Sequence, residues 1–158
     1  MLSILFVFVV RLLLVMLFLP FSALDKILNR KAAIEQARAA VSAPWLAAVL
    51  IFAGFCVEVV MSLAILTGVV DRLAAFILAD YCLVTALLWK QFWKASDFRL
   101  KGASRGREVF WDFLKNVALA GGFLLLTFGT SASGVGRFLA HPLASSQPYV
   151  IIANGNAQ

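Results

Sequence analysis

Histidine and cysteine, the side chains that most often hold haem and metals, are scarce in this sequence. The only histidine, His141, stands beside Pro142 near the C-terminal end of the chain. A b-type haem in a membrane protein needs axial ligands from within the membrane-crossing segments, and the long apolar runs of this sequence contain no histidine. Cys56 and Cys82 form neither a CxxC pair nor a zinc-binding spacing. We therefore expect no metal site and no redox cofactor of the chain's own; electrons for a redox step would come from a partner or from a quinone.

Acidic residues are also few, with 8 Asp and Glu against 14 Lys and Arg and a net charge of +6. Hydrophobic residues make up 63% of the 158 residues, whereas an ordinary globular domain has about 45–50%. They are gathered into long runs, which predicts a polytopic protein embedded in a lipid membrane. Because the basic residues flank these runs, as they do in membrane proteins, we expect no nucleic acid among the partners.

Four apolar runs are long enough to cross a bilayer as helices. They lie at residues 2–21, 44–67, 72–89 and 108–130. The very short link between the second and third runs requires these two helices to be antiparallel neighbours. The expected fold is all-α, a membrane-spanning antiparallel four-helix bundle.

The rest of the chain divides into connections and a tail. In the first connection, the alanine-rich stretch 32–40 contains strong helix formers and predicts a short interfacial helix. We expect residues 1–130 to form one transmembrane domain, with the first helix bent or ended near Pro20. Residues 131–158 are rich in Ser, Gly and Pro, and we expect an extramembrane tail that packs on the bundle or on a partner.

The distribution of basic residues predicts the orientation. The two long connections, residues 25–41 and 90–107, carry ten of the fourteen Lys and Arg residues. Connections rich in Lys and Arg stay on the cytoplasmic side of a membrane. We therefore expect a multi-pass protein of the cytoplasmic (inner) membrane, with cytoplasmic basic loops and both termini outside, in the periplasm of a bacterium.

Ionisable residues inside the apolar runs are the strongest functional signal, because a charge at mid-bilayer costs about 2.5–3.5 kcal/mol. The rise of a helix puts Arg11, Glu58 and Asp80 at comparable depths, so Arg11 could reach either acid. Lys115 is shallower and has Asp112 one turn before it. The predicted intramembrane polar network consists of Arg11, Glu58, Asp80, Asp112, Lys115 and Asn116.

Three interpretations of this network remain open at the level of sequence. The charges could lock the helices into one arrangement, they could form a polar site for a quinone, a proton or a small solute, or they could meet a partner subunit. The sequence assigns a catalytic role to none of these residues.

The order of these features resembles the DoxX family of small four-helix membrane proteins. Arg11 is followed by Phe18 and Lys26, Glu58 is followed by the Gly68-to-Arg72 turn, and aromatic residues close the third run. The pair Lys115 and Asn116 then precedes two glycines in the fourth run. The resemblance covers about residues 5–130, although Ser22 and Ala23 stand where the family usually has a glycine.

The resemblance implies a membrane component of respiratory or sulfur redox systems, since the family is named for a subunit associated with quinol oxidase and thiosulfate:quinone oxidoreductase activity. Our leading hypothesis is an integral subunit or anchor of such an oxidoreductase complex. Three alternatives are a quinone-reactive subunit that uses its intramembrane acids, an accessory subunit on the rim of a large energy-converting assembly, and a conductor of protons or small solutes.

Overall fold

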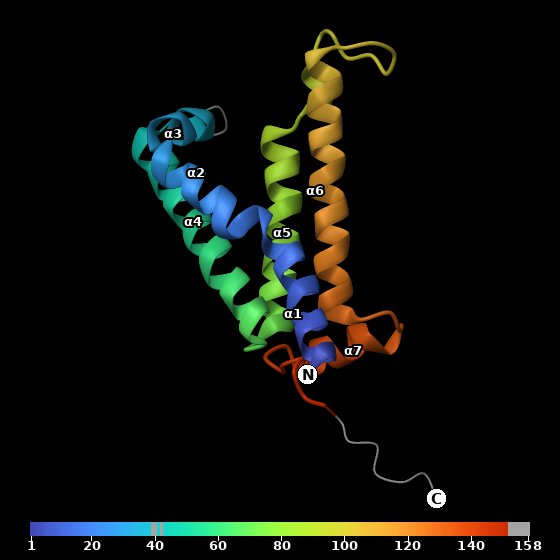
Figure 1. The fold of residues 1–158 in the computed structure, drawn as a ribbon. Helices are drawn as coiled ribbons and strands as arrows, with labels where there is room; N and C mark the ends of the chain where they lie inside the picture. The colour runs from blue at the N-terminus through green and yellow to red at the C-terminus, as the bar shows by residue number, and fades with distance from the viewer. Residues whose placement is uncertain (39–40, 42, 152–158) are drawn as a thin grey trace, which may run out of the picture.

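The computed structural model describes residues 1–38, 41 and 43–151, and every regular element within them is helical. Figure 1 shows long helices side by side, with the N-terminus and the tail helix α7 at one end and α3 near the other. The elements are α1 (Leu2–Val15), η1 (Leu17–Ser22), α2 (Ala23–Leu28), α3 (Arg30–Arg38), α4 (Pro44–Thr67), α5 (Asp71–Trp89), η2 (Phe92–Lys94), α6 (Arg105–Phe128) and α7 (Ser133–Ala140).

Four segments are long and apolar enough to cross a membrane, so the chain is a multi-pass membrane protein. They are Leu2–Leu28, Pro44–Thr67, Asp71–Lys94 and Arg105–Phe128. Large apolar side chains such as Phe52, Leu63 and Leu125 point outward on these helices. An exterior of this kind would be a liability in water, but it is what contact with lipid tails requires.

The first span is kinked in its middle. Leu19 has extended backbone angles (φ −121°, ψ 111°), as expected for a residue that precedes proline, and Pro20 has no N–H for the helical ladder. The predicted bend near Pro20 is present, but the helix resumes as α2 and continues to Leu28 rather than ending at residue 21. Figure 1 shows α2 crossing in front of α4, and Lys26 of α2 bonds to Glu58 of α4.

Local signals explain the ends of the other helices. Pro44 occupies the first turn of α4, and Gly68 ends it in the left-handed conformation (φ +78°), with its N–H bonded to the carbonyl of Ala64. The side chain of Ser104 accepts a hydrogen bond from the N–H of Arg107 and caps α6. The predicted helix at 32–40 is seen as α3, over Arg30–Arg38; residues 39 and 40 lie outside the described part.

Helix α5 is central, packing against α4 on one side and most extensively against α6 on the other. Its small residues, including Ala75 and Ala79, are fully buried and let the neighbouring helices approach. The core between the helices contains Val15, Phe18, Ile65, Leu78 and Phe123. Along the first span and α5, the apolar residues of this layer lie between Arg11 and Asp71 on one side and Ser22 and Tyr81 on the other.

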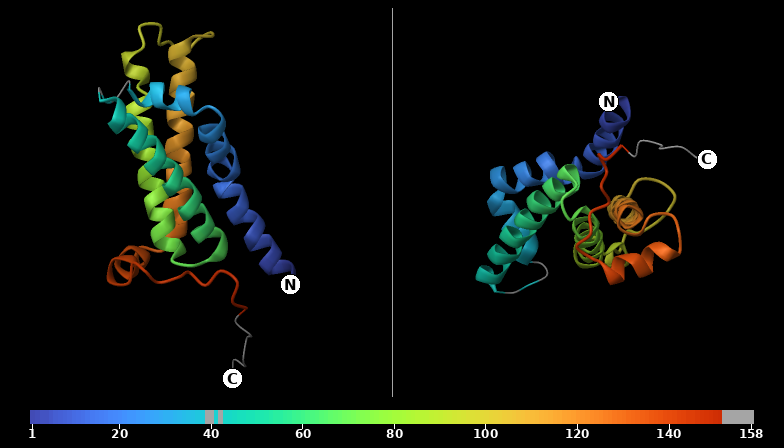
Figure 2. Two further views of the ribbon diagram at one scale, coloured as in Figure 1. Left: turned by 90° about the vertical axis from the view of Figure 1, so that its left-hand side faces the viewer. Right: turned by 90° about the horizontal axis from the view of Figure 1, so that it is seen from below.

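The C-terminal tail folds back onto the bundle as far as the structure describes it, to residue 151; residues 152–158 of the predicted tail lie outside that part. Helix α7 packs through Phe138 against Phe76 and Phe128. The chain then runs across the ends of α4 and α5 (Figure 2, right), where the Ser145 hydroxyl donates to the carbonyl of Gly68 at 2.5 Å.

Candidate functional site

A cavity of about 620 Å³ lies between α2, α3, α4 and α5. Its volume falls in the range of about 300–1,000 Å³ that is typical of small-molecule sites. Its walls are mainly apolar, with Ile51 and Val57 from α4 and Val84 and Leu88 from α5. Val84 and Leu88 also belong to the exposed apolar exterior, so this wall continues to the surface that faces lipid.

Glu58 of α4 is the central polar group of the cavity, and only 2% of the residue is exposed. The Lys26 ammonium donates to both of its carboxylate oxygens, at 2.7 and 2.8 Å. The hydroxyls of Ser22 (3.1 Å) and Tyr81 (2.9 Å) donate to Oε1. Lys26 also donates to Ser22 at 2.7 Å. A buried carboxylate requires such compensation, because burying a charge without a partner is very unfavourable.

Close packing of α4 against α5 makes room for the tyrosine. A Cβ atom added to Gly54 would lie 3.0 Å from the Tyr81 hydroxyl oxygen. Gly54 stands one turn before Glu58, and Ser62 stands one turn after it; all three are buried. The row of small residues therefore lets Tyr81 reach the carboxylate from the neighbouring helix.

The far rim of the cavity is formed by α3 and the end of α5. Ala33 and Gln36 of α3 and, from the end of α5, Trp89 and the adjoining Lys90 belong to the lining. The indole N–H of Trp89 donates to the backbone carbonyl of Gln36 at 3.2 Å. This single hydrogen bond ties α3 to α5 across the rim of the cavity.

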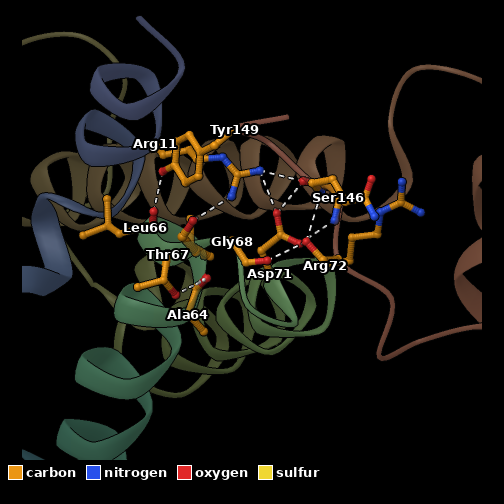
Figure 3. A network of polar contacts seen from close by, with 12 residues as sticks. Arg11, Ala64, Leu66, Thr67, Gly68, Asp71, Arg72, Ser146 and Tyr149 are labelled. Atoms are coloured by element: carbon orange, nitrogen blue, oxygen red, sulfur yellow. Dashed lines mark hydrogen bonds and ion pairs between the residues drawn. The ribbon is translucent and has the colours of Figure 1, made fainter. Parts of the chain in front are cut away.

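Arg11 belongs to a second polar cluster, shown in Figure 3. Its guanidinium lies 2.7 Å from the carboxylate of Asp71 and donates to the carbonyl of Ile65 at 2.6 Å. It also donates to the Ser146 hydroxyl at 2.7 Å. Ser146 in turn donates to Asp71 through its backbone N–H (2.8 Å) and its hydroxyl. The tail thus completes the coordination of a buried ion pair.

The expectation that Arg11 pairs with Glu58 or Asp80 is therefore wrong. Depth along the helices was the only criterion for this pairing, and the first span bends at Leu19, in η1, before it reaches the level of Glu58. Arg11 pairs instead with Asp71 at the start of α5, and Lys26, which follows the bend, pairs with Glu58.

Of the other predicted network residues, only Asn116 lines the cavity that contains Glu58, and none of them bonds to Glu58 in the described part of the chain. Asp80 is exposed on α5, whereas the prediction placed it in the bundle interior; helical phase turns it away from the buried face. Asp112 lies 3.2 Å from Lys115 and 3.2 Å from Lys90, but the Lys115 side chain is 72% exposed. Asn116 lines the cavity and donates to the backbone carbonyl of Asp112 at 3.0 Å.

Five residues whose side chains belong to the two clusters were not among the predicted site residues: Ser22, Lys26, Asp71, Tyr81 and Ser146. Lys26 was assigned to the first connection because the first helix was expected to end at residue 21. Its spacing of four residues from Ser22 was a usable signal, since both side chains then share one helix face. For Asp71, the usable signal was that Arg11 lies within an apolar run and needs an acidic partner. Asp71 stands in the very short link between the second and third runs.

The part of the chain that the structure describes thus defines a helical multi-pass membrane protein with two separate buried ion pairs. The sequence profile of the DoxX family matches residues 6–91. This range is more than half of the chain and includes both ion pairs, and the protein belongs to the DoxX family. No curated protein and no solved structure shows significant similarity to the chain.

Proposed function

We propose that this protein is an integral subunit of a respiratory or sulfur redox complex, and that its cavity receives the ring of a quinone. The observation that carries this proposal is a buried carboxylate, surrounded by hydroxyl and ammonium donors, at one side of a largely apolar cavity of about 620 Å³. Membership of the DoxX family supports the part of the proposal that concerns the membrane location. The redox complex and the quinone are our own inferences.

The residues suit a molecule with an apolar body and carbonyl oxygens. Tyr81 and Lys26 are hydrogen-bond donors that can turn from Glu58 toward a ring oxygen, and Ile51, Val57 and Leu88 can enclose the ring and its tail. A quinone supplies two-electron redox chemistry and takes up two protons when it is reduced. The electrons would come from a partner subunit, and the cavity would hold the ring and exclude lipid.

Glu58 and the groups bonded to it could also take part in proton transfer. The Tyr81 hydroxyl and the Lys26 ammonium each share a proton with the carboxylate, and Ser22 links Lys26 to Oε1. If Tyr81 or Lys26 gave a proton to a ring oxygen, Glu58 could replace it only after taking up a proton itself, which would have to come from outside the cluster; the transfer would require no helix to move. Asp25, Asn29 and Gln36 at the α2–α3 side offer the nearest further polar groups in the lining.

The proposal includes the orientation predicted from charge. The spans would form an antiparallel bundle in the cytoplasmic membrane, with the α2–α3 region and the α5–α6 connection on the cytoplasmic side and both termini outside. The cavity rim would then lie toward the cytoplasm. A continuous conductor is less well supported, because the apolar layer of Val15, Ile65, Leu78 and Phe123 lies between the two polar clusters.

Decylubiquinone binding to the full-length protein in lipid nanodiscs tests the proposal. We expect saturable quenching of Trp89 fluorescence in a variant that keeps this tryptophan and has phenylalanine at its other three tryptophans. In that background, Tyr81→Phe and Glu58→Gln should weaken binding about tenfold, since a lost hydrogen bond to a charged group is worth about 1.5–3 kcal/mol.

The matched control is Asp112→Asn, which alters a carboxylate of α6 that does not line the cavity. Its affinity should equal that of the unsubstituted background. Circular dichroism establishes that each variant remains helical. Binding that does not saturate, or that is equal in all variants, would overturn the quinone assignment.

A further inference from the structure

Asp80 lies at the middle of α5, as the tenth of its nineteen residues. Nine residues separate it from each end, which corresponds to about 14 Å at the rise of an α-helix. The residue is exposed, and none of the residues that the structure describes forms a hydrogen bond or ion pair with its carboxylate. If the chain stood alone in a bilayer, a carboxylate at this depth would face lipid hydrocarbon.

Helical phase explains the exposure. The buried stripe of α5 includes Asp71, Ala75, Leu78, Cys82 and Ala86. At 100° per residue, Asp80 lies on the opposite side of the helix. There it is part of an outward stripe, which we call the Asp80 face: Leu73, Ile77, Asp80, Val84 and Leu87. Its other four members are apolar, so Asp80 is the one charge in an otherwise lipid-compatible surface.

Three other carboxylates on the spans have basic partners, and one of them, Glu58, also lies well inside its helix. Asp71 is bonded to Arg11, Glu58 to Lys26, and Asp112 to Lys90 and Lys115. Insertion of an aspartate at the centre of a span costs about 2.5–3.5 kcal/mol, and such residues normally face protein or a wet cavity. The exception at Asp80 therefore indicates a surface that is covered when the protein is in its complex.

We propose that the Asp80 face docks a transmembrane helix of a different subunit, and that this helix carries a Lys, Arg or His side chain at the depth of Asp80. The proposal rests on the proposed function, because it gives the chemistry of a partner in the complex. Charge complementarity selects the occupant: a basic side chain neutralises Asp80, while leucine and valine on both helices pack around the pair.

A second copy of this chain fits the face poorly. Two copies related by a two-fold axis through this stripe would bring two Asp80 carboxylates together, and like charges repel strongly at low dielectric. The partner is therefore better sought in another chain. Val84 is shared between the Asp80 face and the cavity wall, so a helix docked here would lie beside the cavity.

Site-specific cross-linking in the native membrane tests the proposal. A photoreactive amino acid is placed at Leu87, on the Asp80 face, or at Leu63, an exposed position on α4 that serves as the control. Each position is tested with Asp80 and with Asp80→Asn, and cross-linked peptides are sequenced by mass spectrometry. Asp80 is exposed and has no hydrogen bond or ion pair among the described residues, so we expect the substitution to leave the fold intact.

We expect the Leu87 probe to capture one apolar segment of a different protein that contains Lys, Arg or His. Asp80→Asn should lower this yield about fivefold, as expected for an intramembrane polar contact of about 1 kcal/mol, and should not change the yield at Leu63. Cross-links to a second copy of this chain, to lipid alone, or to a segment without a basic residue would overturn the proposal, as would an unchanged yield in Asp80→Asn.

A second readout separates this proposal from the quinone assignment. Asp80 does not line the cavity, so Asp80→Asn should bind decylubiquinone as the unsubstituted protein does. Loss of cross-linking with normal quinone binding supports the docking face and leaves the cavity assignment standing. Failure of quinone binding in the unsubstituted protein, with Asp80-dependent cross-linking intact, removes the quinone assignment alone.

Discussion

Arg11 and Asp71, which are 60 positions apart in the sequence, form a buried ion pair with a nitrogen–oxygen distance of 2.7 Å. The pair joins the first span to the start of α5. It is also the point where the tail attaches, because Ser146 bonds both partners. One cluster thus fixes the relative positions of α1, the α4–α5 turn and the C-terminal segment.

Asp71→Asn should destabilise the protein strongly. The substitution leaves the Arg11 guanidinium buried without its counter-charge, and breaking a buried ion pair in this way costs about 3–5 kcal/mol. Unfolding in mixed micelles of mild detergent and SDS, followed by circular dichroism, measures the change. The control is Asp112→Asn, because Asp112 is 43% exposed and such pairs contribute about 0–1 kcal/mol. Equal unfolding curves for the two variants would contradict a stabilising role for the Arg11–Asp71 pair.

Ser146→Ala should loosen the tail while leaving the helices in place. The variant loses the hydroxyl contacts to Arg11 and Asp71 but keeps its backbone N–H bond to Asp71. A loss of about 1–2 kcal/mol is expected for the attachment. Hydrogen exchange of residues 143–151 should accelerate about tenfold, since 1.4 kcal/mol corresponds to a factor of ten. Unchanged exchange in this segment would show that other contacts hold the tail.

Gly134→Ala should detach α7 from the end of the bundle. An added Cβ would lie 1.6 Å from the backbone carbonyl oxygen of Phe128, which no local adjustment can accommodate. Gly136→Ala is the matched control, two residues on in the same helix, because nothing lies within 4 Å of its added Cβ. Limited proteolysis of the two variants in nanodiscs should cleave the tail of the first and spare that of the second. Similar cleavage of both would contradict the close contact of α7 with α6.

The helical class and the presence of four spans could be read from the sequence because they depend on local properties, although the first span extends beyond its predicted end at residue 21 to Leu28. Apolar run length sets each span, and Pro44 and Gly68 mark the ends of α4 in the chain and in the structure alike. The bend at Pro20 was also predictable, since proline removes a backbone donor wherever it stands.

The pairing of charges could not be read in the same way. Depth places Arg11, Glu58 and Asp80 at similar levels, but pairing also depends on the direction of α2 after the bend and on the phase of α5. Those are properties of the packed helices. The phase of Asp80 was available from a helical wheel of residues 71–89, which separates the small buried residues from the Asp80 face.

Gly54→Ala should disturb the cavity site without altering its charges. The new Cβ would lie 3.0 Å from the Tyr81 hydroxyl oxygen, so the ring must shift and its bond to Glu58 lengthens. Gly121→Ala is the control, because nothing lies within 4 Å of its Cβ. Decylubiquinone affinity should fall severalfold in the first variant only, in line with about 1 kcal/mol for a hydrogen bond. If both variants bind equally well, the position of Tyr81 does not matter for the ligand.

Lys26→Met should reveal how far the protein depends on charge balance inside the cavity. The substitution keeps the apolar stem of the side chain but leaves Glu58, which is 2% exposed, with only the hydroxyls of Ser22 and Tyr81. We expect destabilisation of about 3–5 kcal/mol, measured by SDS unfolding.

Lys115→Met is the control for this variant, because its side chain is 72% exposed and its pair with Asp112 should contribute about 0–1 kcal/mol. The double variant Lys26→Met with Glu58→Gln removes both charges and should recover most of the lost stability, since the buried carboxylate no longer lacks a counter-charge. Without recovery in the double variant, the effect of Lys26→Met would have to come from packing of α2 rather than from the ion pair.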